Sequence, residues 1–582
     1  MLYPLSYVGS SCDFGKLSAC GLRRCGYRGL MGRRWVESGG VRLAVYVDGP
    51  VDGVPVVLVH GYPDNASVWD GVVGELAARF RVIRYDVRGA GESGEPDTRD
   101  GYLISQLVDD LATVVREVAG RPVHLVAHDW GSIQAWGAVA DPSLRDLLLS
   151  YTSISGPDLD HLGDWMRRAP KTQVVRQLLH SWYIGAFQVP VVPELVWRIP
   201  LLRRKFHARY RDAKNGVELY RANMVGRLSR PGARRTSVPV QQLALTQDPF
   251  VTPGILEAAD PWCERLWRRP VPAGHWAVRE KPQVVARLVV EFIEHLDGAA
   301  AARELERALV GSGRAPLGKR LALVTGAGSG IGRATALALA ADGAEVLCVD
   351  IDFDAAAVTA KEIGGAAFQL DVSDGTATQR LADHVLAEHG VPDIVMANAG
   401  VAVAGNFLDT TVEDWQRVLD VNLWGVIHTL RAFLPPLVAR GEGGNLVVTA
   451  SAAGFLPLPS LPAYGTTKAA VLMLAQCLAG ELAGDGIAVS AICPGFVHTN
   501  ITSATRFAGL SGDAERAQQV RATEFYRRRG FGPEKVAAAV VAAVKENRTV
   551  VPVTPEAKLG AVSNRVSPAM TRAVLAALSR RV

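Results

Sequence analysis

Cysteine is scarce in this chain: seven cysteines are scattered through 582 residues without a short, repeated spacing. The sequence therefore excludes a small fold held together by disulfides. Cys12, Cys20 and Cys25 have no histidine near them, and no metal site is expected there or elsewhere. The other four cysteines lie in apolar segments that are typical of cores, which fits a reducing compartment.

Long hydrophobic runs and a strong charge of one sign are also missing. The longest uncharged stretch, between Glu442 and Lys468, contains three prolines and several polar residues, so no transmembrane helix is predicted. Residues 1–30 lack the apolar block of a secretory signal peptide. The net charge of +5 is small and scattered, which argues against nucleic acid as a partner. We therefore expect a cytoplasmic protein.

The length and the pattern of apolar residues predict two α/β domains. A chain of 582 residues is too long for one hydrophobic core. Strand and helix signals alternate from about residue 41, as in a parallel sheet covered by helices. The first half is expected to contain strands at residues 54–59, 81–86, 123–128, 147–154 and 238–246. The gap over residues 157–237 is long enough to form a lid over an active site.

Five segments follow from these signals. Residues 1–34 are expected to be a disordered leader or the product of a mis-assigned start codon. Residues 35–297 and 318–555 form the two domains, and residues 298–317 join them as a short helical stretch followed by a Gly/Pro linker. Residues 556–582 are expected to form an amphipathic helical tail.

A candidate nucleophile lies between a strand and a helix in the first domain. In the segment VHLVAHDWG, Asp129 is flanked by the small residues Ala127 and Gly131. A sharp elbow between strand and helix needs small neighbours so that the central side chain stands exposed above the sheet. A carboxylate at that position can open an sp3 carbon by displacement and form an alkyl ester, which water then hydrolyses.

The rest of this machinery follows in the order nucleophile, acid, histidine. Asp248 comes after a strand, and His275 lies in the loop PAGHW. His275 would activate the hydrolytic water, while Asp248 would fix the tautomer of His275. The backbone amides of Tyr62, in the loop HGYP, and of Trp130 would form an oxyanion hole. Each residue alone has an ordinary structural explanation, but their order and context together favour a catalytic site.

On these residues, the first domain resembles the epoxide hydrolase branch of the α/β-hydrolases. Haloalkane and fluoroacetate dehalogenases share the aspartate nucleophile and are the alternative. The resemblance to epoxide hydrolases implies two lid tyrosines that protonate the opened ring. Tyr183 lies five residues before Gln188 and Tyr220 immediately precedes Arg221, both as in that family. These two tyrosines favour an epoxide hydrolase over a dehalogenase.

A glycine-rich loop opens the second domain. In LALVTGAGSGIGRA, residues 321–334, Gly326, Gly330 and Gly332 allow a tight turn and a close approach to a pyrophosphate at a helix N-terminus. Asp350 ends the next strand, where its carboxylate can bond both ribose hydroxyls and repel a 2′-phosphate. The sequence therefore predicts NAD as the cofactor, with NADP as the alternative.

A second catalytic group follows further along the chain. Tyr464 and Lys468 are four residues apart and so lie on one face of a helix. The ammonium group and a bound nicotinamide would lower the pKa of the phenol, so that the tyrosinate takes a proton from an alcohol. Ser451 would hold the substrate oxygen, and Asn422 would hold a water in the proton path.

Residues 318–555 therefore resemble a short-chain dehydrogenase/reductase. The glycine spacing, the Asn398-Ala399-Gly400 turn and Pro494-Gly495 after the sixth strand are those of that family. The resemblance implies a substrate loop at about residues 496–530. It implies that the cofactor is bound by Gly326, Ser329, Gly330, Ile331, Gly332, Asp350, Asp371, Asn398, Ala399, Gly400, Tyr464, Lys468, Pro494, Gly495, Val497 and Thr499.

Taken together, the chain resembles the fused epoxide hydrolase–dehydrogenases of mycobacteria and related actinobacteria. The expected fold class is α/β, with an α/β-hydrolase fold carrying a helical lid, followed by a Rossmann-type doubly wound parallel sheet. The resemblance implies an enzyme that turns an epoxide into a vicinal diol and also oxidises a secondary alcohol or reduces a ketone. It also implies a homo-oligomer through the tyrosine-bearing helix. A dehalogenase fused to a dehydrogenase, or one half acting as a silent scaffold, are the alternatives.

Two further stretches suggest membrane contact and a lipid substrate. Residues 189–202 of the lid are bulky and apolar, and Arg203, Arg204 and Lys205 follow them. The tail has apolar residues spaced as in an interfacial helix, with arginines nearby. The alternative is that both stretches pack on their own domains.

Overall fold

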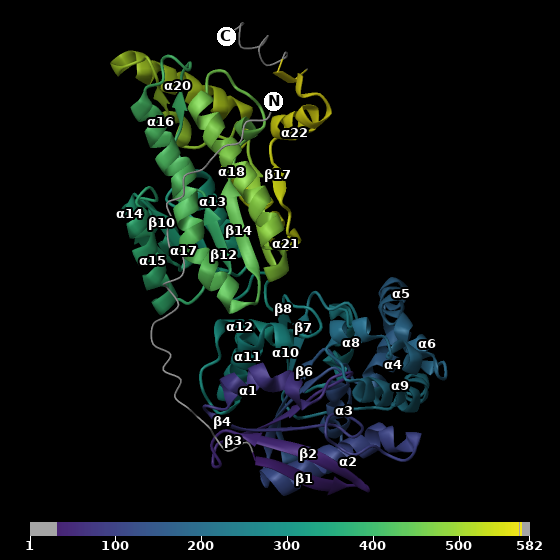
Figure 1. Ribbon diagram of the computed structural model, residues 1–582. Coiled ribbons are helices and arrows are strands. Elements are labelled where there is room, and N and C mark those ends of the chain that lie inside the picture. Colours follow the sequence, from purple (N-terminus) through teal and green to yellow (C-terminus); the bar gives the residue numbers. More distant parts are fainter. Residues whose placement is uncertain (1–31, 570, 573–582) are drawn as a thin grey trace, which may run out of the picture.

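The computed structural model describes residues 32–569 and 571–572 of the chain (Figure 1). The leader expected over residues 1–34 lies almost wholly outside this part. The same holds for the apolar tail residues Met570, Val574, Leu575 and Leu578.

The first domain is built on an eight-stranded sheet with the order β1-β2-β4-β3-β5-β6-β7-β8. From β4 to β8 the strands are parallel, and β1 and β2 form an antiparallel edge that begins three residues before the expected domain boundary. Strands such as VPVVLV are almost wholly apolar because helices cover both faces of the sheet. The strands are β1 (Gly32–Ser38), β2 (Val41–Asp48), β3 (Val54–Val59), β4 (Phe80–Tyr85), β5 (Val123–His128), β6 (Leu148–Ile154), β7 (Val240–Leu245) and β8 (Leu266–Val271).

Successive residues of these strands enter two different cores, one on each face of the sheet. Val57 and Val59 pack with α2 and α3, whereas Val56 and Leu58 pack with α1 and α11. This alternation follows from the two-residue period of a strand. The helices are α1 (Asp70–Leu76), α2 (Ile104–Val114), α3 (Trp130–Val139), α10 (Ala277–Glu280) and α11 (Pro282–Leu296).

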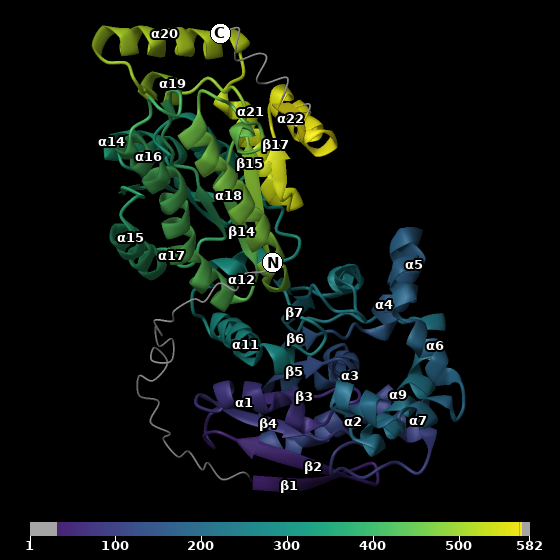
Figure 2. The same cartoon turned by 45° about the horizontal axis from the view of Figure 1, so that its top comes forward.

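A helical insertion lies between β6 and β7 and gathers on one side of the first domain (Figure 2). It occupies the stretch that was expected to be a lid. Among the described helices, none combines the length and the apolar character needed to cross a bilayer. The insertion consists of α4 (Leu159–Arg168), α5 (Lys171–His180), α6 (Trp182–Gln188), α7 (Val192–Val196), α8 (Pro200–Phe206) and α9 (Tyr210–Ser229).

The second domain is a parallel seven-stranded sheet with the order β11-β10-β9-β12-β14-β15-β17. Helices α15, α17 and α18 cover one face, and α13, α14 and α21 cover the other, as predicted for a doubly wound fold. The strands are β9 (Leu321–Thr325), β10 (Glu345–Asp350), β11 (Ala366–Gln369), β12 (Ile394–Ala397), β14 (Gly444–Thr449), β15 (Ile487–Cys493) and β17 (Val550–Pro552). The helices are α13 (Gly330–Ala341), α14 (Phe353–Ile363), α15 (Gly375–Glu388), α17 (Gly425–Arg440), α18 (Pro462–Glu481) and α21 (Pro533–Glu546).

The segment between the domains, residues 298–317, contains the expected short helix, and this helix packs against both domains. Helix α12 (Arg303–Ala308) buries Leu305 in a small core of the first domain. Arg307, on the same helix, pairs with Asp393 of the second domain at 2.8 Å. Leu305 thus contacts the first domain and Arg307 contacts the second, and these contacts hold the segment in place.

The start of the expected tail also belongs to the second domain. Helix α22 (Pro555–Val566) has Ala557 fully buried. A carboxylate oxygen of Glu556 accepts a hydrogen bond from the Phe496 amide at 2.8 Å, at the base of the loop expected to bind substrate. The predicted helical character thus holds up to Val566, and this helix packs on its own domain, which is the alternative given above for this stretch.

The two domains meet at the N-terminal edge of the second sheet. The guanidinium group of Arg269, on β8, donates to both carboxylate oxygens of Glu442, just before β14, at 2.9–3.1 Å. Arg287, on α11, adds a bond to the same carboxylate at 3.1 Å. Gln247 Nε2 donates to the Gly484 carbonyl, just after α18, at 2.9 Å. A buried pair of this kind disfavours separation of the domains, because breaking it would leave an uncompensated charge.

Two candidate active sites

Asp129 lies on a sharp elbow between β5 and α3. Its φ of 52° is unusual for a residue other than glycine, and its amide donates to the Ile154 carbonyl at 2.9 Å. A Cβ atom on Gly131 would lie 2.3 Å from the Val59 carbonyl oxygen, so only glycine fits there. The small neighbours predicted for Asp129 are therefore needed because the helix packs closely against β3.

Asp129, His275 and Asp248 come together as the sequence predicts. His275 Nδ1 lies 2.8 Å from Asp248 Oδ2, and His275 Nε2 lies 3.5 Å from Asp129 Oδ1. Asp248 also accepts hydrogen bonds from the amides of Phe250 at 2.7 Å and Val251 at 3.1 Å. The acid is thus fixed on both sides, and it orients the imidazole toward the nucleophile.

The two carboxylates set the charge of the histidine. Burial alone would lower the pKa of His275, but the charge of Asp248 and the hydrogen bonds to both carboxylates outweigh burial and raise this pKa to about 10. Burial likewise raises the pKa of Asp129, and the contacts with His275 reverse this and hold the pKa below its usual value. The resting site is therefore an ion pair of a carboxylate and an imidazolium.

Replacing Asp129 with asparagine should lower the pKa of His275 from about 10, because one of the two negative charges that stabilise the imidazolium is removed. A titration of the imidazole by NMR measures this change. The variant Asp160→Asn is the control, since Asp160 is buried but pairs with Arg227. An unchanged value in the Asp129 variant would mean that the nucleophile and the histidine are not electrostatically linked.

One amide of the predicted oxyanion hole, that of Tyr62, binds the carboxylate of the nucleophile. The Tyr62 amide donates to Asp129 Oδ2 at 2.7 Å. This is the arrangement that hydrolysis of an Asp129 ester needs, because the charge then develops on an oxygen of Asp129. Trp130 lies at the first residue of α3. The contribution of its amide stays a prediction.

Both predicted lid tyrosines face the nucleophile. Tyr183, on α6, and Tyr220, on α9, have ring centroids 6.0 Å apart and meet edge to face. Burial raises the pKa of both phenols, and the nearby charge of Asp129 raises each further. Two phenols that stay protonated beside a carboxylate are suited to donate a proton.

Sequence reasoning missed a residue that supports the acid. Ser155 Oγ donates to Asp248 Oδ2 at 2.7 Å, and Ser155 has a φ of 51° directly after β6. The signal was the SGP sequence at the end of a strand, which is typical of a turn. His128, whose Nε2 lies 2.8 Å from the His275 carbonyl, was missed as well.

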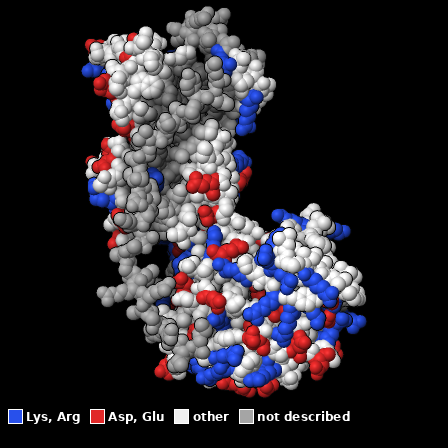
Figure 3. Space-filling view, in the orientation of Figure 1, with Lys and Arg blue, Asp and Glu red and all other residues white. Residues whose placement is uncertain are grey.

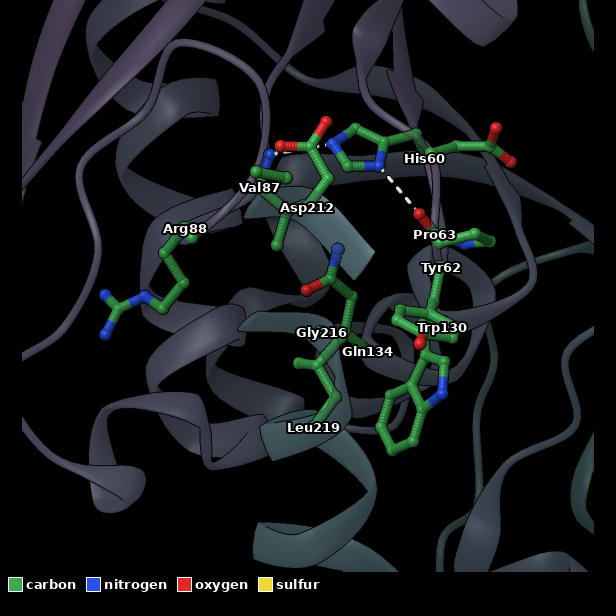
Figure 4. A pocket seen from close by; sticks show the side chains of 14 residues that line it. His60, Tyr62, Pro63, Val87, Arg88, Trp130, Gln134, Asp212, Gly216 and Leu219 are labelled. Carbon is green, nitrogen blue, oxygen red and sulfur yellow. Dashed lines mark hydrogen bonds between the residues drawn. The ribbon is translucent and has the colours of Figure 1, made fainter. Parts of the chain in front are cut away.

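A small pocket of about 20 Å³ lies behind the oxyanion loop (Figure 4). The side chain of Gln134, on α3, points into it beside Tyr62 and Asp212. Within the described part of the chain, neither the amide oxygen nor the nitrogen of Gln134 has a hydrogen-bond partner. A buried amide in this state calls for an ordered water or a polar group of a ligand.

The glycine loop of the second domain has the shape that a dinucleotide requires. Gly326 and Gly330 adopt φ values of 68° and 52°. A Cβ atom on Gly332 would lie 2.0 Å from the Gly326 carbonyl oxygen. Ser329, at the N-terminus of α13, makes no capping bond with its side chain, so the first amides of that helix are left for a phosphate. These residues fit the pyrophosphate of NAD or NADP.

Other residues predicted to bind the cofactor lie along the C-terminal edge of the same sheet. Asp350 ends β10 and accepts a hydrogen bond from the Gly328 amide at 2.8 Å. The Asn398 side chain donates to the Thr325 carbonyl at 3.0 Å, which ties the turn after β12 to β9. The Gly495 amide donates to Thr554 Oγ1 at 3.1 Å. Asp350, Asn398 and Gly495 thus stand where ligands bind in open α/β sheets.

The remaining predicted residues differ in their surroundings. Thr499 lies against Gly330, whereas the Val497 side chain is buried in the domain core, which leaves only its backbone for a ligand. Asp371 is exposed after β11 and accepts from the Ser373 amide at 2.9 Å, so its contact with adenine stays a prediction. The others are Ile331, partly buried on α13, and Ala399, Gly400 and Pro494, in turns that follow strands.

Ser451, Tyr464 and Lys468 meet above the end of β14. Burial raises the pKa of Tyr464 above its usual value, and a hydrogen bond with the Ser451 side chain offsets only part of this rise. Lys468 Nζ lies 5.7 Å from the centre of the Tyr464 ring and donates to the Thr449 carbonyl at 2.7 Å. Burial also lowers the pKa of Lys468 to about 8. The three side chains form one group, as predicted.

The Asn422 side chain makes hydrogen bonds to the backbone that the sequence did not predict. It is fully buried in the π-helical segment Asp420–Trp424. Its side chain accepts from the Val401 amide at 2.8 Å and donates to the Val401 carbonyl at 2.9 Å. Asn422 therefore holds the loop after β12 in place, and the predicted water beside it stays a prediction.

Comparisons with known proteins agree with this architecture. Residues 54–178 match the alpha/beta hydrolase fold family, and residues 320–508 match the short chain dehydrogenase family. The chain is 43% identical over 569 residues to "Probable oxidoreductase EphD" of Mycobacterium tuberculosis, covering 92% of this chain and 96% of that protein. Over 195 residues it is 39% identical to the (3R)-3-hydroxyacyl-CoA dehydrogenase of Rattus norvegicus, covering 31% of this chain and 75% of that protein.

A solved short-chain dehydrogenase/reductase from Burkholderia phymatum in complex with NAD is 33% identical to the chain. It covers 43% of this chain and 93% of its own length, with a TM-score of 0.40. The fused architecture expected from the sequence is confirmed by the two family matches and by the long relative. This chain is an enzyme, a short-chain oxidoreductase with an alpha/beta hydrolase domain, and it belongs to the family of the mycobacterial probable oxidoreductase EphD.

Proposed function

We propose that the chain is a bifunctional enzyme. Its first site converts an epoxide and water into a vicinal diol. Its second site transfers hydride between a secondary alcohol or ketone and a nicotinamide cofactor. One arrangement carries the first half: the Tyr62 amide holds one oxygen of Asp129, His275 faces the other oxygen, and two protonated phenols lie nearby.

In the first step, Asp129 Oδ1 attacks a carbon of the epoxide ring. The ring C–O bond breaks, an ester bond to Asp129 forms, and the ring oxygen becomes an alkoxide on the same molecule. Tyr183 or Tyr220 gives its phenolic proton to that oxygen. A halide leaves without needing a proton, so a pair of buried tyrosines favours an epoxide over a haloalkane as substrate.

In the second step, water hydrolyses the ester. The ester carries no charge, so the imidazolium of His275 loses part of its stabilisation and passes its proton, through solvent, to the tyrosinate. Neutral His275 then takes a proton from water, and the resulting hydroxide adds to Cγ of Asp129. The Tyr62 amide meets the charge that develops on Oδ2, which already lies 2.7 Å away.

Collapse of this intermediate completes the cycle. The bond between Cγ and the diol oxygen breaks, and that oxygen takes the proton from His275. The new carboxylic acid of Asp129 then returns its own proton to His275, which restores the resting ion pair. The overall reaction adds one water to the epoxide, and one oxygen of Asp129 is exchanged for an oxygen of water.

At the second site, Ser451 holds the alcohol oxygen and Tyr464 Oη takes the hydroxyl proton. The ammonium group of Lys468, when charged, stabilises the tyrosinate. Its contact with the Thr449 carbonyl fixes its position beside the ring. The cofactor, when bound, supplies the acceptor or donor of the hydride. The glycine loop, Asp350 and the Asn398 turn would hold it.

Asp350 should decide the choice between the two nicotinamide cofactors. Replacing it with serine should weaken NAD and favour NADP by about 10-fold or more relative to wild type, because a negative charge next to the 2′-phosphate is removed. Binding titrations of both cofactors with the two proteins measure this change. Asp371→Ser is a control, since the proposed contact of Asp371 is with adenine. A wild-type protein that already prefers NADP would contradict the assignment.

The two sites are far apart within one chain. The hydrolase domain contacts residues that precede β12, β14 and β15, at the N-terminal edge of the second sheet. Ser451 and the glycine loop follow their strands, at the C-terminal edge. The six residues of β14 alone span roughly 20 Å between these edges. A diol made at the first site therefore leaves that site before it can reach the second site.

A panel of epoxides tests the proposal directly. The full chain is incubated with each epoxide, with and without NAD, and the products are followed by mass spectrometry. We expect a gain of one water in both cases, and a further loss of two hydrogens only with NAD. Release of halide from haloalkanes, with no gain of water by any epoxide, would instead identify a dehalogenase.

A further inference from the structure

Helix α5 of the lid exposes its apolar face to solvent and turns a polar face toward the protein, which is the opposite of the usual arrangement in a globular protein. Val175, Leu178, Leu179 and Trp182, at the start of α6, follow the i, i+3, i+4, i+7 spacing of one helical face. This stripe normally faces a core, but here all four side chains are exposed, Leu179 and Trp182 by 70% and 73%. Within residues 32–569 and 571–572, the stripe therefore has no apolar partner that covers it.

The buried side of α5 is polar. Gln177, its one buried residue, donates to the Phe250 carbonyl at 2.8 Å and accepts from Thr252 Oγ1 at 2.7 Å. Both partners lie in the loop that follows Asp248, and the Phe250 ring packs against His275 and Tyr183. Hydrogen bonds to the catalytic loop thus hold α5 in place and turn its apolar stripe toward solvent.

The helices that follow in the lid also carry exposed apolar residues. Leu201, at the start of α8, is 75% exposed. We name the whole set the lid face, and it consists of Val175, Leu178, Leu179, Trp182, Val189, Val191, Val192, Leu195, Val196, Ile199 and Leu201. Exposed apolar residues gathered on a lid in this way point to an interaction site.

The stretch of sequence that carries the lid face is rich in positive charge. Residues 167–209 contain nine Lys and Arg residues and one acidic residue, Glu194, which pairs with Arg221 at 2.6 Å. Figure 3 shows blue side chains interspersed with uncharged surface on the upper part of this lobe, with red side chains on its lower part. Arg176, Arg204 and Lys205 are among the exposed cations. Apolar residues within a basic surround are the composition of elements that lie in the interface of an anionic bilayer.

We propose that the lid face docks on the surface of an anionic lipid bilayer. Trp182 and the leucines would enter the boundary between headgroups and acyl chains, and the surrounding cations would contact lipid phosphates. The excess of positive charge favours this occupant over a second copy of the chain, whose lid would repel it. Trp182 points outward from the helix that carries Tyr183. Docking would therefore bring the first active site next to the lipid phase.

Flotation of the full chain with liposomes tests this proposal. Vesicles of phosphatidylcholine alone are compared with vesicles that contain about one-third phosphatidylglycerol, at low and high salt. We expect wild type to bind the anionic vesicles at least about 10-fold better, with a loss at high salt, because screening weakens contacts between surface charges. The docking does not depend on the proposed chemistry, so it is measured by binding alone.

Two sets of variants locate the contact. Replacing Leu178, Leu179 and Trp182 with glutamate should abolish flotation, whereas Trp182→Phe should retain it. Arg176→Glu with Arg204→Glu and Lys205→Glu should abolish the preference for anionic vesicles. The apolar control replaces Val51, Val358 and Leu408, which are exposed elsewhere, with glutamate. The basic control replaces Arg516, Arg521 and Arg528 of α20 (Gly512–Arg529) with glutamate. Both control sets should bind as wild type does, and circular dichroism confirms that each variant is folded.

Several outcomes would overturn the proposal. Negligible flotation of wild type would do so, as would equal flotation of the lid variants and the controls. Sedimentation velocity identifies the main rival: if wild type does not float and the glutamate variant of the lid forms smaller assemblies than wild type, the lid face is an interface between protein chains. Equal binding of wild type to neutral and anionic vesicles would show that the cations do not contribute to binding. It would therefore contradict docking on an anionic bilayer.

Discussion

Replacing His275 with glutamine should stop turnover of epoxides and leave a covalent ester on the protein. The first step uses Asp129 and a lid tyrosine, so it can proceed in this variant. The second step needs a base next to the ester, and glutamine cannot act as one. We expect steady-state hydrolysis to fall by about 1,000-fold or more, as for other members of catalytic groups that act as a unit.

Intact-mass measurement detects the ester as a gain equal to the mass of the epoxide, one per chain. Digestion should place this gain on the peptide that contains Asp129. The double variant His275→Gln with Asp129→Asn is the control, and it should show no gain because the nucleophile is absent. A gain that persists in the double variant, or no gain with an epoxide that wild type converts, would contradict the role of Asp129.

Replacing Tyr464 with phenylalanine should abolish hydride transfer and leave addition of water intact. The variant keeps the ring and its packing but loses the hydroxyl that exchanges the proton with the alcohol, so we expect a loss of about 100-fold or more. Absorbance of the reduced cofactor measures one activity, and formation of the diol measures the other. The contact between the domains lies at the opposite edge of the sheet, so the change should not reach the hydrolase site.

The reciprocal variant makes this test complete. Tyr183→Phe combined with Tyr220→Phe should abolish opening of the epoxide and leave hydride transfer unchanged. Because the two sites are far apart, we expect them to work independently. Loss of both activities in a folded Tyr464 variant would contradict this.

Much of both sites could be predicted because their chemistry requires particular residues at particular strand ends. Asp129 needs small neighbours, and Gly131 is one because a side chain there would strike the Val59 carbonyl. The glycine loop, Tyr464 and Lys468 have spacings set by a turn and by one helical face. Such local requirements leave a trace in the sequence.

The residues that were missed depend on contacts between distant segments. Ser155 supports Asp248 across 93 residues of sequence, and serine in a turn has many other uses. Arg269 and Glu442 are 173 residues apart, and neither charge alone indicates a contact between domains. The segments around Leu305 and Ala557 were predicted to contain helix, but the residues on which they dock were not, because short helices with few apolar residues carry a weak periodic signal.

The reversed orientation of α5 was equally hidden. Its apolar spacing predicts a helix, but the period of the pattern does not say whether the stripe faces a core or solvent. The bonds of Gln177 and His180 to the loop after Asp248 fix the orientation. The sequence pointed to residues 189–202 as the apolar part of the lid, and the structure adds the stripe from Val175 to Trp182 to it.

The central claim is that Asp129 itself becomes the ester and is then hydrolysed at its own carbonyl carbon. A single turnover in water labelled with oxygen-18, with protein in excess over a converted epoxide, tests this most directly. Our account predicts that one labelled oxygen enters the peptide that contains Asp129, while the first diol formed carries unlabelled oxygen. A labelled diol together with an unlabelled Asp129 peptide would show that water attacks the epoxide directly, and would contradict the account.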